Sequence, residues 1–127
     1  MLILILSLIF VGLSLFTVAF QLGLFLKKPW GEYTMGGKVK GVLPLHLRIS
    51  ALIQSFLILF NGFVVLNHGD VFNLLPSPFT QGWMIFIIVL MSISFILNVI
   101  TPSHKERRLW GPITLVMLIS GLIIFFG

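Results

Sequence analysis

The chain alternates four long apolar segments with three shorter polar connections. The apolar segments cover residues 2–26, 45–67, 83–101 and 111–127, and the connections cover 27–44, 68–82 and 102–110. A helix rises 1.5 Å per residue, so about 20 apolar residues cross the roughly 30 Å hydrocarbon core of a bilayer. Short connections join antiparallel neighbours. The pattern therefore predicts one all-α domain, a compact antiparallel bundle of four transmembrane helices.

Polar side chains recur at helical spacing within three of these segments. They are Thr17 and Gln21 in the first, Ser50, Gln54 and Asn61 in the second, and Ser94, Asn98 and Thr101 in the third. Membrane helices use such residues to hold one another, at about 0.6–2 kcal/mol per hydrogen bond. Packing within the bundle and a ligand-binding interior are therefore both open interpretations. In the first segment, Ala19 and Gly23 are four residues apart, which predicts close approach by a second helix.

The composition supports a membrane protein and restricts its chemistry. Of 127 residues, 58% are hydrophobic and 9% are charged, whereas soluble domains carry about 25% charged residues. Zero cysteines exclude disulfides, thiol chemistry and cysteine metal sites. The three histidines are far apart in the sequence, and no G-x-S-x-G nucleophile motif is present. We expect no metal and no cofactor, and a membrane enzyme is the weakest hypothesis.

All eight Lys and Arg residues lie in or beside two of the three connections. Four are in 27–44, Arg48 lies just inside the next span, and three are in 102–110. Positively charged loops remain cytoplasmic. We therefore predict cytoplasmic basic loops and both termini outside, and this placement explains the net charge of +5 without a nucleic-acid partner.

The first connection permits three interpretations. Gly36 and Gly37 could form the turn of a β-hairpin in which Thr34 faces Val39, because glycine readily adopts the positive φ of a type I′ turn. They could instead belong to a flexible linker or to a nest of backbone N–H groups that binds an anion.

Glu32 and Glu106 are the two acids on the basic side. One interpretation pairs them with Arg48, Arg107 or Arg108, so that they link the two loops. The other makes Arg48, oriented by Glu32, a cation that binds a lipid headgroup or an anionic metabolite at the cytoplasmic mouth. No acid falls within a predicted span, which argues against a proton-coupled transporter. The candidate binding residues are Trp30, Glu32, Tyr33, Gly36, Gly37, Arg48, Gln54, Asn61, Asn98, Arg107 and Arg108.

The pattern P-W-G-E-Y-x-M-G-G-x-x-x-G-V-L-P-x-x-x-R covers residues 29–48, and Asn98 and E-R-R-x-W-x-P at 106–112 follow it. Together these residues resemble a family of small four-span bacterial integral membrane proteins whose activity is not established. The resemblance implies a four-helix plan in a bacterial cytoplasmic membrane and supplies no ligand or catalytic residue.

Two function hypotheses follow. In the first, the bundle binds or transports an anionic small molecule or lipid headgroup, with the bilayer and its anionic lipids as partners. In the second, it is an accessory subunit that packs against itself or another membrane protein through its small-residue faces. Polar residues lining a cavity would favour binding, whereas the same residues bonded from helix to helix in a dry bundle would favour the accessory role.

Overall fold

The computed structural model describes residues 1–34, 37–71 and 73–127, and this part of the chain is all-helical with no strand. Its elements are α1 (Leu2–Phe25), the short 3-10 helix η1 (Gly31–Tyr33), α2 (Leu45–His68), α3 (Ser77–Ile100) and α4 (His104–Phe126). The four α-helices have 23 or 24 residues each, and all are long and apolar enough to cross a membrane. The predicted fold class is confirmed, and the four candidate spans indicate a multi-pass membrane protein.

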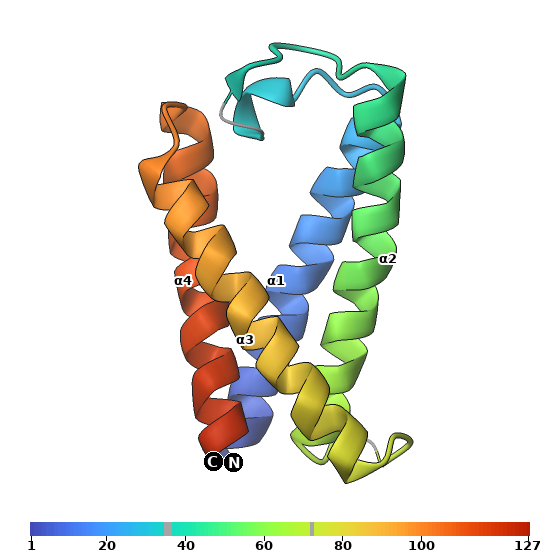
Figure 1. The fold of residues 1–127 in the computed structure, drawn as a ribbon, viewed down its shortest axis with the longest axis vertical. Coiled ribbons are helices and arrows are strands. Elements are labelled where there is room, and N and C mark those ends of the chain that lie inside the picture. The colour runs from blue at the N-terminus through green and yellow to red at the C-terminus, as the bar shows by residue number, and fades with distance from the viewer. Residues whose placement is uncertain (35–36, 72) are drawn as a thin grey trace.

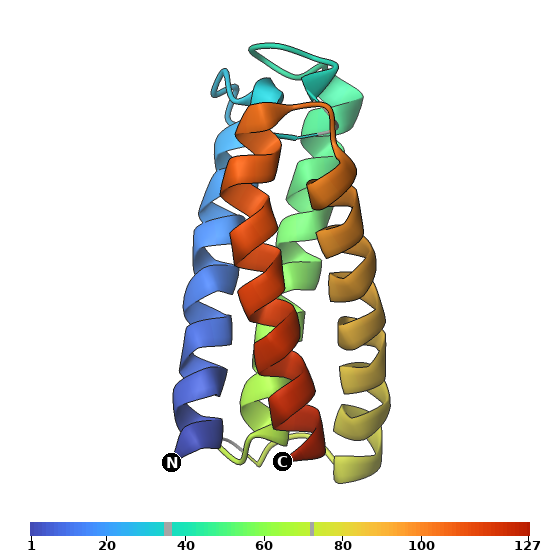
Figure 2. The same cartoon turned by 90° about the vertical axis from the view of Figure 1, so that its left-hand side faces the viewer.

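The helices form an open bundle rather than a closed cylinder. Helix α1 packs along α2, α3 packs along α4, and α1 also contacts α4. Figure 1 shows that α2 and α3 approach each other at the end where residues 69–76 join them and diverge toward the 27–44 connection. Both termini lie at the first of these ends, opposite the 27–44 connection (Figures 1 and 2).

Small residues on α2 allow it to lie close to α1. Ala51, Ser55 and Gly62 are buried, and a side chain at Gly62 would meet Val11 and Ser14 of α1. This face is the close-packing surface that small residues provide in membrane helices. Gly23 of α1 has a different neighbour from the one predicted, as described below.

Helices α3 and α4 begin earlier than the hydropathy pattern predicts. Helix α3 starts at Ser77 instead of residue 83, because Pro78 fits the first turn of a helix. Helix α4 starts at His104 instead of residue 111, with Ser103 as its N-cap. Glu106 therefore belongs to α4, and the prediction that no spanning helix contains an acid is wrong. Helices α1 and α2 begin and end within one residue of their predicted bounds.

The core has two parts. One lies toward the termini and consists of Phe10, Val64, Val65, Met84, Ile87, Met117 and Ile124. The other lies beneath the 27–44 connection and consists of Phe20, Leu24, Leu43, Ala51 and Trp110. Many large apolar side chains on the outer faces of the helices are exposed, as expected for surfaces that contact lipid.

The 27–44 connection folds over one end of the bundle, and its described residues do not form the β-hairpin that was one of the three interpretations. Glu32 lies in η1, and the described residues on either side of the turn form no strand, so Thr34 and Val39 are not a cross-strand pair. The Gly31 N–H donates to the Gly41 carbonyl at 2.9 Å and closes the connection into a loop. Gly37 has φ of 72°, and its predicted partner in the turn, Gly36, lies outside the described residues.

Candidate functional site

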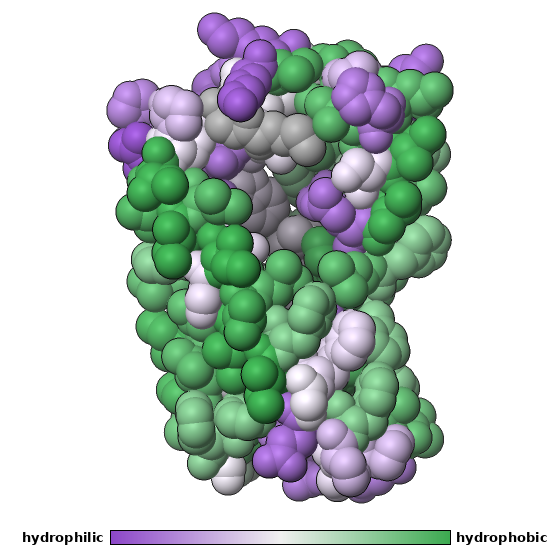
Figure 3. All heavy atoms as spheres, viewed as in Figure 1, coloured by the Kyte–Doolittle hydropathy of each residue, from purple (hydrophilic) through white to green (hydrophobic). Residues whose placement is uncertain are grey.

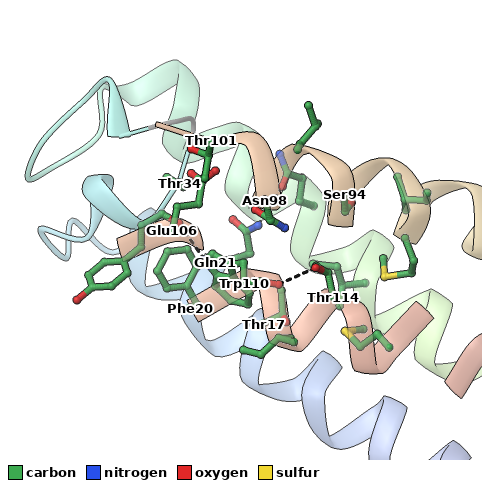
Figure 4. Close-up of a pocket in the computed structure, with 18 of the residues that line it drawn as sticks. Thr17, Phe20, Gln21, Thr34, Ser94, Asn98, Thr101, Glu106, Trp110 and Thr114 are labelled. Atoms are coloured by element: carbon green, nitrogen blue, oxygen red, sulfur yellow. Dashed lines mark hydrogen bonds between the residues drawn. The ribbon is translucent and has the colours of Figure 1, made fainter. Parts of the chain in front are cut away.

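A cavity of about 790 Å³ lies among the four helices beneath the 27–44 connection (Figure 4). Ligand pockets in proteins typically measure about 300–1,000 Å³, so the cavity is large enough for part of a lipid or for a small metabolite. Residues from all four helices, from η1 and from the two basic connections line it.

The lining changes from polar to apolar with depth. At 1.5 Å per residue, the polar members lie mostly within about 15 Å of the basic end of each helix. Those near this end are Thr17, Gln21, Gln54, Ser94, Asn98, Thr101 and Thr114, with Thr34, Lys38 and Glu106 at the mouth, whereas Ser14 and Asn61 lie deeper. Figure 4 shows Thr34, Thr101 and Glu106 toward that end, with Thr17, Ser94 and Thr114 farther in. The deeper lining is mainly Phe10, Leu57, Ile58, Leu90, Met91, Ile113 and Met117.

The cavity opens sideways between α2 and α3. On the two helices that flank the opening, the lining residues Gln54 of α2 and Leu97 and Ile100 of α3 are also exposed on the outer surface, the last two by 56% and 67%. They mark the rim of the opening. Figure 3 shows the surface hollowed on this side, with hydrophilic side chains beside the hollow over α2 and a mostly hydrophobic surface below it. A molecule in the cavity can therefore also contact the bilayer.

Several polar side chains of the lining are bonded within the protein. The Gln21 amide donates to Gln54 Oε1 at 2.9 Å, and the Gln54 amide donates to Ser50 Oγ at 3.2 Å. Asn61 is buried deeper, where its Oδ1 accepts from the Trp83 indole at 2.8 Å. These bonds account for much of the polar face predicted on α2.

Ser94 and Asn98 differ from these residues. Within the part of the chain that the structure describes, neither side chain has a hydrogen-bond partner, and both are half-buried in the cavity wall. Unpaired polar groups are costly where lipid replaces water. The wall of α3 therefore presents a hydroxyl and an amide that are available to water or to a ligand.

Two oppositely charged side chains belong to the lining at its polar end. Glu106 is only 6% exposed, and its backbone N–H donates to the Ser103 hydroxyl at 3.2 Å, which fixes the start of α4. Lys38 is exposed and lies on the 27–44 connection. Among the described residues, no three histidine or acidic side chains cluster as metal ligands would.

Aromatic rings form part of the same end of the cavity. Phe20 and Trp110 meet edge to face with centroids 4.9 Å apart. The Trp110 indole donates to the Tyr33 carbonyl at 2.9 Å, which ties η1 to α4. All three residues line the cavity.

Further contacts fasten the 27–44 connection to α4. The Ser103 hydroxyl donates to the Glu32 carbonyl at 2.6 Å, and Lys105 Nζ lies 2.6 Å from Glu32 Oε2. The hydrogen bond from Lys105, together with its charge, lowers the pKa of Glu32 below its ordinary value. Glu32 thus joins the 27–44 connection to the start of α4, which agrees with the interpretation that the acids link the two basic regions, but its partner is Lys105 and not one of the predicted arginines.

The predicted binding arginines lie elsewhere. Arg48 Nε donates to the Phe25 carbonyl at 3.0 Å, and Arg107 Nη2 donates to the Thr101 carbonyl at 2.7 Å. Each arginine binds a carbonyl at the C-terminal end of the preceding helix, where a cation is favourable. Neither lines the cavity, nor does the exposed Arg108.

The cavity therefore brings together some of the predicted site residues and leaves others out. Tyr33, Gln54, Asn61 and Asn98 line it. Outside its lining lie Trp30, Glu32, Gly37, Arg48, Arg107 and Arg108, and Gly36 is outside the described residues. The sequence analysis did not identify Lys38 or Glu106 as lining residues. The S-x-x-E spacing from Ser103 to Glu106 is a helix-start signature that could have placed Glu106 inside α4.

Comparison of the chain with models of protein families, with curated proteins and with solved structures finds no match. The resemblance to small four-span bacterial membrane proteins accordingly stays a prediction, and the site is interpreted from its own chemistry.

Proposed function

We propose that this protein binds a membrane lipid, or an amphiphile built like one, in the cavity between α2 and α3. The polar head lies at the basic end, and the apolar chains extend along the deeper lining and out between the two helices. The observation that carries the proposal is the division of a laterally open cavity into a polar part and an apolar part. A small soluble metabolite would use only the polar half.

The charge distribution favours a head with an anionic group such as phosphate. All eight Lys and Arg residues lie in 27–48 or 105–108, against Glu32 and Glu106, which leaves a balance of +6 at this end. A concentration of positive charge attracts anionic ligands and headgroups. The cation that lines the cavity is Lys38, so Lys38 takes the role that the sequence analysis gave to Arg48. In a bacterial cytoplasmic membrane this basic end would face the cytoplasm.

Ser94 and Asn98 would complete the head site. Their side chains have no hydrogen-bond partner within the described chain, and a lipid head or its bound water would supply one. In a purely structural accessory subunit, we would expect these groups to be bonded between helices. The open cavity therefore favours binding over the accessory hypothesis.

Native mass spectrometry of the purified protein with added bacterial phospholipid tests the proposal. We expect wild type to retain lipid and Ser94→Phe to lose most of it, because the ring occupies the polar part of the cavity where the head would lie and removes the Ser94 hydroxyl. Ile93→Phe is the matched control, since Ile93 is 51% exposed on the outer face of the same turn and does not line the cavity. Arg48→Ala should also retain lipid. Equal retention by Ser94→Phe and Ile93→Phe, with both variants folded, would refute the proposal.

A further inference from the structure

The cavity has a floor partway along the bundle. Its deepest lining residues are Phe10, Asn61, Leu90 and Met117, one from each helix. Phe10, Asn61 and Met117 are buried. Phe10 and Met117 also belong to the core that lies toward the termini, so closely packed side chains lie directly beyond the cavity.

The gap between α2 and α3 closes at the same depth. Asn61 of α2 accepts from the Trp83 indole of α3 at 2.8 Å, and Phe60 meets the Trp83 ring edge to face with centroids 5.1 Å apart. Figure 1 shows the two helices close together at this end and apart at the basic end. The exposed rim residues Leu97 and Ile100 lie near the basic end of α3. The side opening therefore faces the half of the bilayer at the basic end.

The depth of the apolar part resembles the thickness of one leaflet. Measured from Gln54 to Asn61 on α2, or from Asn98 to Leu90 on α3, this part is about 10–12 Å deep at 1.5 Å per residue. Half of the hydrocarbon core of a bilayer is about 15 Å. An acyl chain whose head lies beside Gln54 and Asn98 would therefore reach the floor before the bilayer midplane.

We infer that the cavity encloses one acyl chain of a lipid from the leaflet at the basic end, and that its floor limits the length of this chain. The inference rests on the proposed function and assigns the chain-length class and the leaflet of the same occupant. The second chain of a two-chain lipid passes out through the side opening, against Leu97 and Ile100. A chain longer than the apolar part would have to overpack the floor, which packed interiors tolerate poorly.

A matched pair of lipids tests the floor directly. Dilauroylphosphatidylglycerol and distearoylphosphatidylglycerol share the head and differ in the length of their acyl chains. In native mass spectrometry with equal amounts of both, wild type should retain the shorter lauroyl lipid in at least about fivefold preference, the value for an overpacking cost at the low end of the usual range. Equal retention, or a preference for the stearoyl lipid, would overturn the inference.

Two variants move the floor in opposite directions. Leu90→Trp places a larger side chain in the apolar part and should raise the preference for the lauroyl lipid. Met117→Ala deepens this part and should lower the preference. Val89→Trp is the matched control for Leu90→Trp, because Val89 is 52% exposed on the outer face of the same turn and does not line the cavity. The control should keep the wild-type preference, and an equal shift in both tryptophan variants would contradict the assignment of the floor.

The closed floor also predicts that the protein holds its lipid without carrying it across the bilayer. In vesicles that contain a fluorescent phospholipid in both leaflets, a membrane-impermeant quencher should bleach only the outer leaflet, as in vesicles without protein. Loss of the inner-leaflet fluorescence that Ser94→Phe abolishes would show that the cavity is a passage and would overturn the floor.

The outcomes separate this inference from the proposed function. If wild type retains both lipids equally, the chain-length assignment is wrong and lipid binding stands. If wild type retains neither lipid, both proposals fail. The comparison in wild type decides the chain-length assignment even if Leu90→Trp or Met117→Ala does not fold.

Discussion

At the scale of single residues, the absence of a Cβ at Gly23 determines where the 27–44 connection meets α1. A Cβ built there would lie 2.1 Å from Cζ3 of Trp30, closer than any real contact allows. Trp30 also stacks on Phe20 with centroids 5.8 Å apart. The glycine that was predicted to admit a neighbouring helix instead admits the indole of the loop that covers the cavity.

Gly23→Ala should therefore destabilise the protein even though alanine is the better helix former. Overpacking of this kind costs about 1–3 kcal/mol, which outweighs the roughly 1 kcal/mol that alanine gains over glycine in a helix. Thermal unfolding in detergent should show a lower Tm. Gly12→Ala is the control, because a Cβ at Gly12 meets nothing within 4 Å, and it should leave Tm unchanged or raise it. Equal Tm values for the two variants would show that Trp30 does not occupy this position.

The Glu32–Lys105 ion pair makes a pH-dependent contribution at the same scale. Lys105 lowers the pKa of Glu32 from its ordinary value of 4.5, so folding is favoured by the ionised form. That stabilisation is complete above the ordinary pKa and is lost as the pH falls through the lower, folded-state pKa. Comparing Tm of wild type and Glu32→Gln, we expect wild type to be higher at neutral pH and the difference to disappear in acid. High salt should shrink the difference as well, and a difference that is constant across pH would contradict the assignment.

At the scale of elements, the α1–α2 and α3–α4 hairpins are each held by the same kind of arginine contact. Arg48, near the start of α2, binds the Phe25 carbonyl of α1, and Arg107, near the start of α4, binds the Thr101 carbonyl that follows α3. In each case a guanidinium satisfies a carbonyl that the helix end leaves without an intrahelical donor. The arginines thus join consecutive helices at the basic end, and the cavity remains free of them.

The helix ends also show how far hydropathy can predict this fold. Four spans, their order and the buried small face of α2 follow from the pattern of apolar and small residues, because a continuous apolar segment of about 20 residues satisfies its backbone hydrogen bonds in lipid as a helix. The starts of α3 and α4 do not follow from hydropathy. They depend on local signals, Pro78 in the first turn and the Ser103 hydroxyl at the Glu106 N–H.

The candidate site could be predicted only in part. The spacing of Gln54 and Asn98 predicted that each belongs to a polar helix face, for which packing and a ligand-binding interior were both open, and in the structure both residues line the cavity. Spacing could not show that Gln54 is already bonded to Gln21, or that Asn98 has no partner within the described chain. Charge alone also could not show that Lys38 lines the cavity and Arg48 does not, because their positions depend on how the 27–44 connection crosses the end of the bundle.

At the scale of the whole molecule, the positive charge and the two chain termini lie at opposite ends of the bundle. The eight Lys and Arg residues lie in the 27–44 connection or in the first turns of α2 and α4, at one end of the bundle, and both termini lie at the other (Figure 1). Such an asymmetric molecule should insert in one orientation, with its basic end in the cytoplasm. The cavity mouth and Lys38 would then face the cytoplasmic leaflet, whose anionic lipids add to the attraction.

Single cysteines can test this orientation without interference, because the chain has none of its own. Ser77 and His104 are matched positions, since each is exposed and is the first residue of a helix, at opposite ends of the bundle. In intact bacteria expressing the protein, a membrane-impermeant maleimide should label Ser77→Cys. His104→Cys should react only after the cells are permeabilised. Neither change alters the number of Lys and Arg residues on which the orientation depends. The reverse labelling pattern would place the cavity mouth outside the cell. It would contradict the prediction that the Lys and Arg residues hold this end in the cytoplasm.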